Sequence, residues 1–118
     1  MAKPVIIAKL TFQDGKREEG LRVFDQMFEH VNTNEPGTLI YEISISEDGS
    51  LVHSYERLAD SEAALTHFGT VGETFLERFL AALDPERIVV YGTPSAALKE
   101  ATAAFHPTYM QPLAGFTR

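Results

Sequence analysis

Two kinds of hydrophobic pattern follow one another along this chain, and their order constrains the fold more than any other feature. Segments in which apolar residues alternate or run continuously are typical of strands, and segments in which they recur every three or four residues are typical of helices. The order along the chain is strand, helix, strand, strand, helix, strand. This order predicts an α+β, ferredoxin-like β-α-β-β-α-β fold, in which an antiparallel four-stranded sheet carries both helices on one face.

The first half of the chain contains a strand and a helix that end at clear turn signals. Residues 4–12 are apolar on both faces and stop at an Asp-Gly turn, which predicts a central strand. The helix that follows has one apolar stripe, formed by Leu21, Phe24, Phe28 and Val31. Pro36 and Gly37 end this helix, because proline cannot continue it.

The second half predicts a hairpin, a helical region and a last strand. Residues 38–46 and 51–58 alternate on either side of an Asp-Gly turn, which tolerates the positive φ angles of a tight hairpin. In the helical region that follows, Gly69 and Gly72 are predicted to divide a short helix from a longer one. Pro85 opens the last strand, whose apolar residues again run continuously.

Length and charge limit the number of domains and the classes of partner. The chain has 118 residues, enough for one hydrophobic core, and we expect a ferredoxin-like domain at residues 1–94 and a C-terminal extension at residues 95–118. Ten Lys and Arg against 17 Asp and Glu give a net charge of −7, so no nucleic acid and no membrane is expected as a partner. A cytoplasmic location is expected, since the first residues do not resemble a signal peptide.

The first and last strands present apolar residues on both faces, although helices are expected to cover only one of them. The bare face must then find another surface, because a large apolar patch is rarely left exposed. We therefore expect a homodimer that forms by sheet-to-sheet packing.

The C-terminal extension holds more apolar side chains than disordered termini usually do. Ser95 can cap a helix that ends at His106-Pro107, and the residues beyond are predicted to be extended. We expect this extension to pack on the same domain or on the partner subunit, as a clasp or as a lid over a pocket.

Part of the chain resembles a known family. Residues 34–43 (NEPGTLIYEI) followed by residues 51–68 (LVHSYERLADSEAALTHF) are similar to the antibiotic biosynthesis monooxygenase domain family, over about residues 5–91. The resemblance implies a dimeric α+β barrel with a reaction cavity between the sheet and the helices of each subunit. The family includes cofactor-independent monooxygenases that act on quinols and polycyclic phenols, haem-degrading enzymes and at least one small-molecule isomerase.

Several positions of the family pattern can be located in this chain. The helix His of the pattern falls on His67, and the aromatic-Glu pair at the strand end falls on Tyr55 and Glu56. The haem-degrading branch has Trp at the position of His67 and Asn near the position of Ala8, so the resemblance disfavours haem degradation. The polycyclic-phenol enzymes also use a Trp, which this chain lacks. Glu56 points away from Tyr55, and an ion pair that can cross the dimer interface is its expected role.

His67 is the predicted general base. It follows the apolar stripe of its helix, and an unperturbed imidazole, with a pKa near 6.5, can remove a phenolic or α-carbonyl proton at neutral pH. The alternative is a partly buried histidine that is bonded to a backbone carbonyl.

A strand supplies the predicted partners of this base. His53, Tyr55 and Arg57 share one face, since alternate residues of a strand point the same way, and together they can bind an anionic or enolate oxygen. We expect Tyr55 and Arg57 to be catalytic, and His53, Tyr41 and Phe68 to contact the substrate. The alternative for the strand trio is a polar cluster at the dimer interface.

These residues lead to one expected function and two alternatives. We expect a cofactor-independent monooxygenase acting on a small quinol, phenol or enolisable ligand, because an activated substrate can pass an electron to oxygen directly. The alternatives are a non-catalytic homodimeric module that binds a small ligand, and a small-molecule isomerase on the same fold. The sequence has no nucleotide-binding, acyl-transfer or zinc motif, so no cofactor and no metal is expected.

Overall fold

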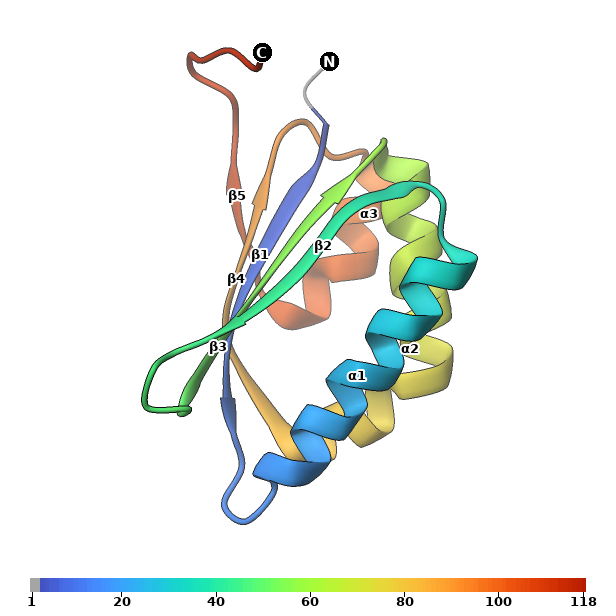
Figure 1. The fold of residues 1–118 in the computed structure, drawn as a ribbon. Helices are drawn as coiled ribbons and strands as arrows, with labels where there is room; N and C mark the ends of the chain where they lie inside the picture. Colours follow the sequence, from blue (N-terminus) through green and yellow to red (C-terminus); the bar gives the residue numbers. More distant parts are fainter. Residues whose placement is uncertain (1–2) are drawn as a thin grey trace.

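Figure 1 shows the fold of the protein in a computed structural model, which describes residues 3–118. The elements are, in chain order, β1 (Val5–Phe12), α1 (Arg17–Asn34), β2 (Thr38–Ile45), β3 (Leu51–Leu58), α2 (Ser61–Ala82), β4 (Leu83–Tyr91), α3 (Ala96–Thr102), the 3-10 helix η1 (Ala103–Phe105) and β5 (Thr108–Met110). The elements from β1 to β4 follow the order β-α-β-β-α-β, so the predicted ferredoxin-like fold is confirmed.

The sheet has five strands in the order β2-β3-β1-β4-β5. The predicted central strand, β1, pairs antiparallel with both β3 and β4, and β5 adds to β4 in parallel. Helices α1 and α2 lie side by side over one face of the sheet, and α3 lies on the same side, in contact with α2 (Figure 1). In the described part of the chain, the other face carries no helix.

The helix-covered face is packed at its two ends and open in the middle. One buried cluster consists of Ile6, Leu58, Ala64, Val90 and Leu98, and another of Leu10, Phe24, Val52, Ala82 and Leu83. Between these clusters, Ala8 of β1 pairs with Ser54 of β3. Two such short side chains in the middle of the sheet leave room beneath the helices, and this room becomes the cavity described below.

Helix α1 turns a different face to the sheet than the sequence predicts. Its buried residues are Gly20, Val23, Phe24, Met27 and Val31, whereas two members of the predicted stripe, Leu21 and Phe28, are exposed. A Cβ atom at Gly20 would lie 2.7 Å from the ring of Phe12. This close approach directs Gly20 toward the sheet and turns Leu21 outward.

Helix α2 and strand β4 also depart from the sequence prediction. Helix α2 is continuous over 22 residues, so the predicted division at Gly69 and Gly72 is wrong. Each glycine costs a helix interior about 1 kcal/mol, and the burial of Phe75 alone contributes about 1.5–3 kcal/mol in return. Strand β4 begins at Leu83, and Pro85 falls at an irregularity in its pairing with β1, where a residue without an N–H is tolerated.

The C-terminal extension packs on its own chain as far as β5. The Ser95 hydroxyl accepts a backbone N–H of α3, so the predicted helix cap is confirmed. The hydroxyls of Thr102 and Tyr109 lie 2.9 Å apart and connect α3 to β5. Beyond β5, the side chains of Leu113 and Phe116 are 98% and 80% exposed. A contact of this last segment with a partner subunit stays a prediction.

Candidate functional site

A cavity of about 220 Å³ lies between the sheet and its helices. Strands β1 to β4 form one wall, and α1, α2, α3 and η1 form the other. The lining is mainly apolar and includes Phe24, Phe68, Leu76, Phe79 and Phe105. A concave apolar space with a few polar groups is the usual form of a small-molecule site.

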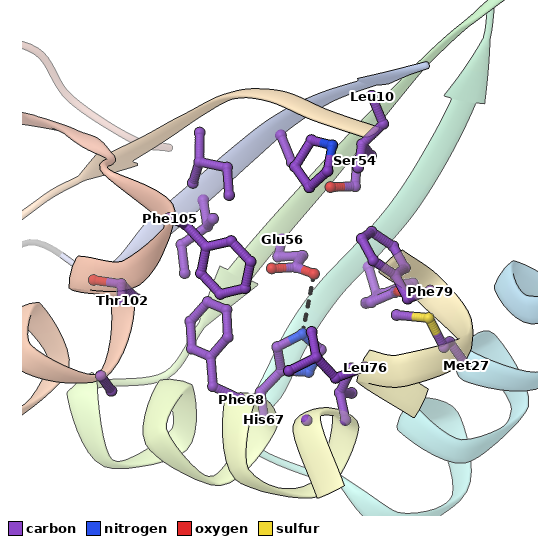
Figure 2. Close-up of a pocket in the computed structure, with 18 of the residues that line it drawn as sticks. Leu10, Met27, Ser54, Glu56, His67, Phe68, Leu76, Phe79, Thr102 and Phe105 are labelled. Atoms are coloured by element: carbon purple, nitrogen blue, oxygen red, sulfur yellow. Dashed lines mark hydrogen bonds and ion pairs between the residues drawn. The ribbon is translucent and has the colours of Figure 1, made fainter. Parts of the chain in front are cut away.

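Three ionisable side chains form a row at this cavity, which we call the charged row: Glu35, His67 and Glu56. The imidazole of His67 lies between the two carboxylates and donates from Nδ1 to Glu35 Oε1 at 2.7 Å and from Nε2 to Glu56 Oε1 at 3.0 Å. All three side chains are buried, and Glu56 and His67 line the cavity. Figure 2 shows the second carboxylate oxygen of Glu56 pointing away from His67, toward Phe105.

Local sequence features position the three members of the charged row. Asp60 caps α2 by accepting a backbone N–H of its first turn, about two turns before His67. Glu35 follows the last residue of α1 and precedes Pro36, so it sits at the corner where the chain enters β2. Glu56 lies on β3, whose pleat directs it to the helix-covered face.

Hydroxyl groups complete the surroundings of Glu35. Thr38 donates to Glu35 Oε1 at 3.1 Å, and Thr70 donates to Glu35 Oε2 at 2.8 Å. His30 Nε2 lies 3.7 Å from Glu35 Oε2. A buried charge is tolerated when it is paired and hydrogen-bonded, as Glu35 is. Glu35 also borders a second hollow, of about 210 Å³, at the corner between α1 and β2.

The charged row fixes the protonation state of His67. Burial on its own would lower the pKa of the imidazole, but the charge of Glu56 and the hydrogen bonds to Glu35 and Glu56 outweigh burial and raise the pKa of His67 to about 10. Burial also opposes the ionisation of Glu35, yet the hydrogen bond from His67 lowers the pKa of that carboxyl. At neutral pH, His67 is therefore an imidazolium with a proton on each nitrogen.

Two aromatic rings flank the imidazolium. The rings of Tyr41 and Phe68 meet that of His67 edge-on, with centroids 5.8 Å and 5.6 Å away. Burial raises the pKa of Tyr41, and the charges of Glu56 and Glu35 raise it further, so its hydroxyl stays neutral. Both rings line the cavity, and a contact with a substrate stays a prediction.

The structure places the predicted site residues on two faces of the sheet. Three of them line the cavity: His67, Tyr41 and Phe68. The other three alternate with Glu56 along β3 and point to the opposite face: His53, Tyr55 and Arg57. The cavity therefore brings His67 together with Glu56, and it does not bring His67 together with Tyr55 or Arg57.

Sequence patterns do not identify Glu35, and they give Glu56 a different partner. An ion pair that can cross a dimer interface is the expectation for Glu56, whereas the structure pairs it with His67 of the same chain. Glu56 lies on the same face of β3 as the buried Val52 and Leu58, but the sequence does not show which face is buried. Glu35 belongs to a turn, and no pattern marks it.

The charged row is closed by its own hydrogen bonds. Both nitrogens of His67 already donate to carboxylates, so neither offers a lone pair to a metal ion. Among residues 3–118, no group of three or more His, Asp or Glu side chains is placed to hold a metal ion. Over the same residues, no helix is both long and apolar enough to cross a membrane.

Known proteins share this fold. The family model described as antibiotic biosynthesis monooxygenase matches residues 5–82. No curated protein matches the chain. Among solved structures, MupZ from Pseudomonas fluorescens is 20% identical with a TM-score of 0.80, over 100% of this chain and 96% of MupZ. This similarity includes the C-terminal extension, which the family model leaves out.

Two further structures are similar over most of their length. SnoaB, a cofactor-independent oxygenase from Streptomyces nogalater, is 13% identical with a TM-score of 0.67, over 81% of this chain and 97% of SnoaB. Rv0793 from Mycobacterium tuberculosis is 20% identical with a TM-score of 0.69, over 81% of this chain and 99% of Rv0793. At these identities, the likeness shows the fold alone.

Proposed function

The chain belongs to the antibiotic biosynthesis monooxygenase family, and from this premise we propose that it is a cofactor-independent monooxygenase that oxidises a small, uncharged phenol or quinol. The observation that carries the proposal is an apolar cavity with the carboxylate of Glu56 in its wall. The fold shared with SnoaB, a cofactor-independent oxygenase, supports the reaction class.

Glu56 is the proposed general base, in place of His67. His67 has no free lone pair while both of its nitrogens are protonated, so it cannot accept a proton in that state. The second oxygen of Glu56 points toward Phe105, on the cavity side (Figure 2). A phenolic O–H that reaches this oxygen can donate its proton there. His67 is then a positioning residue, which holds the other oxygen of Glu56 in place.

The proposed reaction needs only the substrate and molecular oxygen. Removal of the phenolic proton gives an electron-rich phenolate, which passes one electron to O₂, and the two radicals combine to form a C–O bond. The peroxide then breaks at its O–O bond. One oxygen atom stays on the ring as the new carbonyl of a quinone, and the other leaves as water with the two hydrogens that the substrate loses. All the electrons that O₂ accepts come from the substrate.

The charge of the site supports an uncharged substrate. The charged row has two carboxylates and one imidazolium, so the cavity wall carries one net negative charge. A substrate carboxylate would be repelled at this wall, and the repulsion is strong where water is excluded. A neutral hydroxyl avoids this repulsion and can still donate to Glu56.

Oxygen uptake by the purified protein tests the proposal. We expect the protein to consume oxygen with some members of a panel of quinols and polyphenols, and Glu56→Gln to lower the rate about a hundredfold or more. Glu42→Gln is the matched control, because Glu42 is exposed on the opposite face of the sheet and should keep the full rate. Uptake that is equal in the two variants would contradict the role of Glu56, and no uptake with any compound would contradict the proposed reaction.

A specific observation favours a second candidate, a non-catalytic module that binds a small hydrophobic ligand. Every hydrogen-bonding nitrogen of His67 is already occupied within the protein, which is also the arrangement of a purely structural buried histidine. For this candidate, we expect apolar ligands to bind with equal affinity to the native protein and to Glu56→Gln. The oxygen-uptake panel distinguishes the two candidates.

We also propose that two chains pack through their open sheet faces. Val5, Ile7 and Val89 of this face are only partly buried, and Tyr91 is 38% exposed. A second copy would cover this apolar surface. Sedimentation of the native protein should show a dimer, and Val89→Glu, which places a charge on this apolar face, should weaken the dimer. A monodisperse native monomer would contradict this assembly.

A further inference from the structure

The charged row continues outward from the cavity to the molecular surface. Beyond Glu35 lies His30 of α1, whose Nε2 is 3.7 Å from Glu35 Oε2. The complete path thus alternates carboxylate and imidazole: Glu56, His67, Glu35 and His30. Its first two links are hydrogen bonds of 3.0 Å and 2.7 Å. Figure 2 shows the inner end of the path, where Glu56 and His67 meet in the cavity.

The path is buried in its middle and more exposed at its outer end, as a route to solvent requires. The side chains of His67 and Glu35 are 3% and 2% exposed, whereas that of His30 is 23% exposed. His30 therefore connects a buried carboxylate with water. At the inner end, the side chain of Glu56 is 10% exposed and lines the cavity.

The hydrogen bonds of His30 orient its ring toward Glu35. The amide of Asn34 lies 3.4 Å from His30 Nδ1 and donates to it, which assigns the ring proton to Nε2. That Nε2 atom is buried, faces Glu35, and has no hydrogen-bond partner among the described residues. The ring of His30 packs edge-on against that of Phe75, with the ring centroids 5.6 Å apart. A small shift of the His30 ring would bring Nε2 within hydrogen-bonding distance of Glu35 Oε2.

We propose that the path of Glu56, His67, Glu35 and His30 is a proton conduit between the cavity and the solvent, with His30 as its outer shuttle. The source of the proton rests on the proposed function, in which Glu56 accepts it from the substrate. The conduit itself is a property of the protein and operates without a substrate.

The conduit moves protons without changing the net charge of the buried row. When Glu56 gains a proton, it loses the negative charge that holds a proton on His67. His67 then releases its Nδ1 proton to Glu35 Oε1. The ring of His30 turns away from Asn34, so that its unprotonated Nδ1 accepts the proton from Glu35, and the resulting imidazolium gives this proton to water as the ring turns back. The charged row carries one net negative charge before the transfer, and it carries the same charge afterwards, with Glu56 and His67 both neutral. Return of the proton from Glu56 to the oxygen intermediate reverses the sequence.

Few other groups face the middle of the conduit. The hydroxyls of Tyr41, Thr38 and Thr70 are neutral, and the two threonines donate to Glu35. Within residues 3–118, no Lys or Arg makes an ion pair with Glu35 or Glu56. The protons of the row are therefore shared only among its own carboxylates and imidazoles.

The exchange of the His67 ring protons with water tests the conduit directly. These N–H groups can be followed by ¹⁵N NMR with water-saturation transfer, in the protein alone. We expect His30→Phe, which keeps the aromatic contact with Phe75, to slow exchange of the Nδ1 proton about tenfold or more while His67 stays protonated. Glu35→Gln removes the carboxylate that accepts the Nδ1 proton of His67, and it should also slow the exchange of this proton with water. His53→Phe on the open sheet face is the matched control and should leave the rate unchanged.

An unchanged exchange rate in His30→Phe would overturn the proposal, because the proton would then leave Glu35 directly into the second hollow. This result does not depend on catalysis, so it is separate from failure of the proposed monooxygenase reaction. A further readout applies to the catalysed reaction. Added imidazole should restore the oxygen uptake that His30→Phe loses, and a purely structural role of His30 would show no such rescue.

Discussion

The two faces of the sheet both carry ionisable and aromatic side chains, but one face buries them at a cavity and the other, within residues 3–118, carries no helix. On β3, Glu56 points into the cavity and pairs with a buried imidazolium, while Tyr55 and Arg57, its direct neighbours in sequence, point to the face without helices. One residue along the strand thus separates the charged row from the open face. The side on which the helices pack decides which polar groups acquire a coupled, buried environment.

Charges on the two faces interact with different strengths. On the open face, Lys9 lies opposite Arg87 on the neighbouring strand, and both are exposed. Water screens the repulsion between these two charges. In the charged row, burial removes that screening, so the protonation of one group depends strongly on its neighbours. The cavity face is therefore where a proton can be accepted, held and passed on.

The largest difference between the faces should appear in stability. His67→Ala leaves Glu35 and Glu56 as unpaired buried carboxylates, and we expect a loss of about 3–5 kcal/mol in the free energy of unfolding. His53→Ala on the open face should change it by less than about 0.5 kcal/mol. Urea unfolding at pH 7 measures both values. Equal losses in the two variants would mean that the faces do not differ as described.

The pH dependence of stability should carry the signature of His67. Its pKa in the folded state, about 10, lies above the ordinary value of 6.5. Protonated His67 therefore contributes its full stabilisation of the folded state below about pH 6.5, and this contribution is lost as the pH rises through about 10. We expect native stability to fall by about 1 kcal/mol or more between pH 7 and pH 9, as measured by urea unfolding.

The opposite sign applies to Glu35, because its pKa is lowered in the folded state. Its contribution is present above the unfolded value of about 4.3 and is lost as the pH falls through the folded value. The control variants concern the fall in stability between pH 7 and pH 9 that we attribute to His67. This fall should vanish in His67→Ala and persist in His53→Ala. If it persisted in His67→Ala, another group would be responsible for it.

A smaller effect should appear in ligand selection. The molecules 1-naphthol and 1-naphthoate have similar shapes, but only the second is an anion at pH 7. We expect 1-naphthol to bind about tenfold more tightly, a difference of about 1.4 kcal/mol, because Glu56 repels a carboxylate. Glu56→Gln should narrow the difference, and Glu42→Gln on the open face should not. Titration calorimetry measures the affinities, and equal affinities in the native protein would contradict the charge argument.

Local patterns in the sequence predicted most of the fold. The order of strands and helices, the central position of β1 and the cap at Ser95 are consequences of periodicity and short-range hydrogen bonds. The orientation of α1 and the continuity of α2 were not predictable in this way. They depend on packing, through the approach of Gly20 to Phe12 and the burial of Phe75.

The site was predictable only in part. Of the predicted site residues, His67, Tyr41 and Phe68 line the cavity, and their roles stay predictions. The inward face of β3 could not be read from its alternation, since both sets of alternate residues mix apolar and polar side chains. Glu35 lies 32 residues from His67 in sequence, so the fold alone brings the two together.

The central claim is that His67 is an imidazolium held between two buried carboxylates at the cavity wall. A ¹⁵N NMR titration of the histidine rings tests it most directly, with His53 of the open face as the reference within the same sample. We predict that both nitrogens of His67 stay protonated beyond pH 8, with a pKa of about 10. Titration of His67 near pH 6.5 would contradict the account, because it would return His67 to an ordinary imidazole that can itself accept a proton at neutral pH.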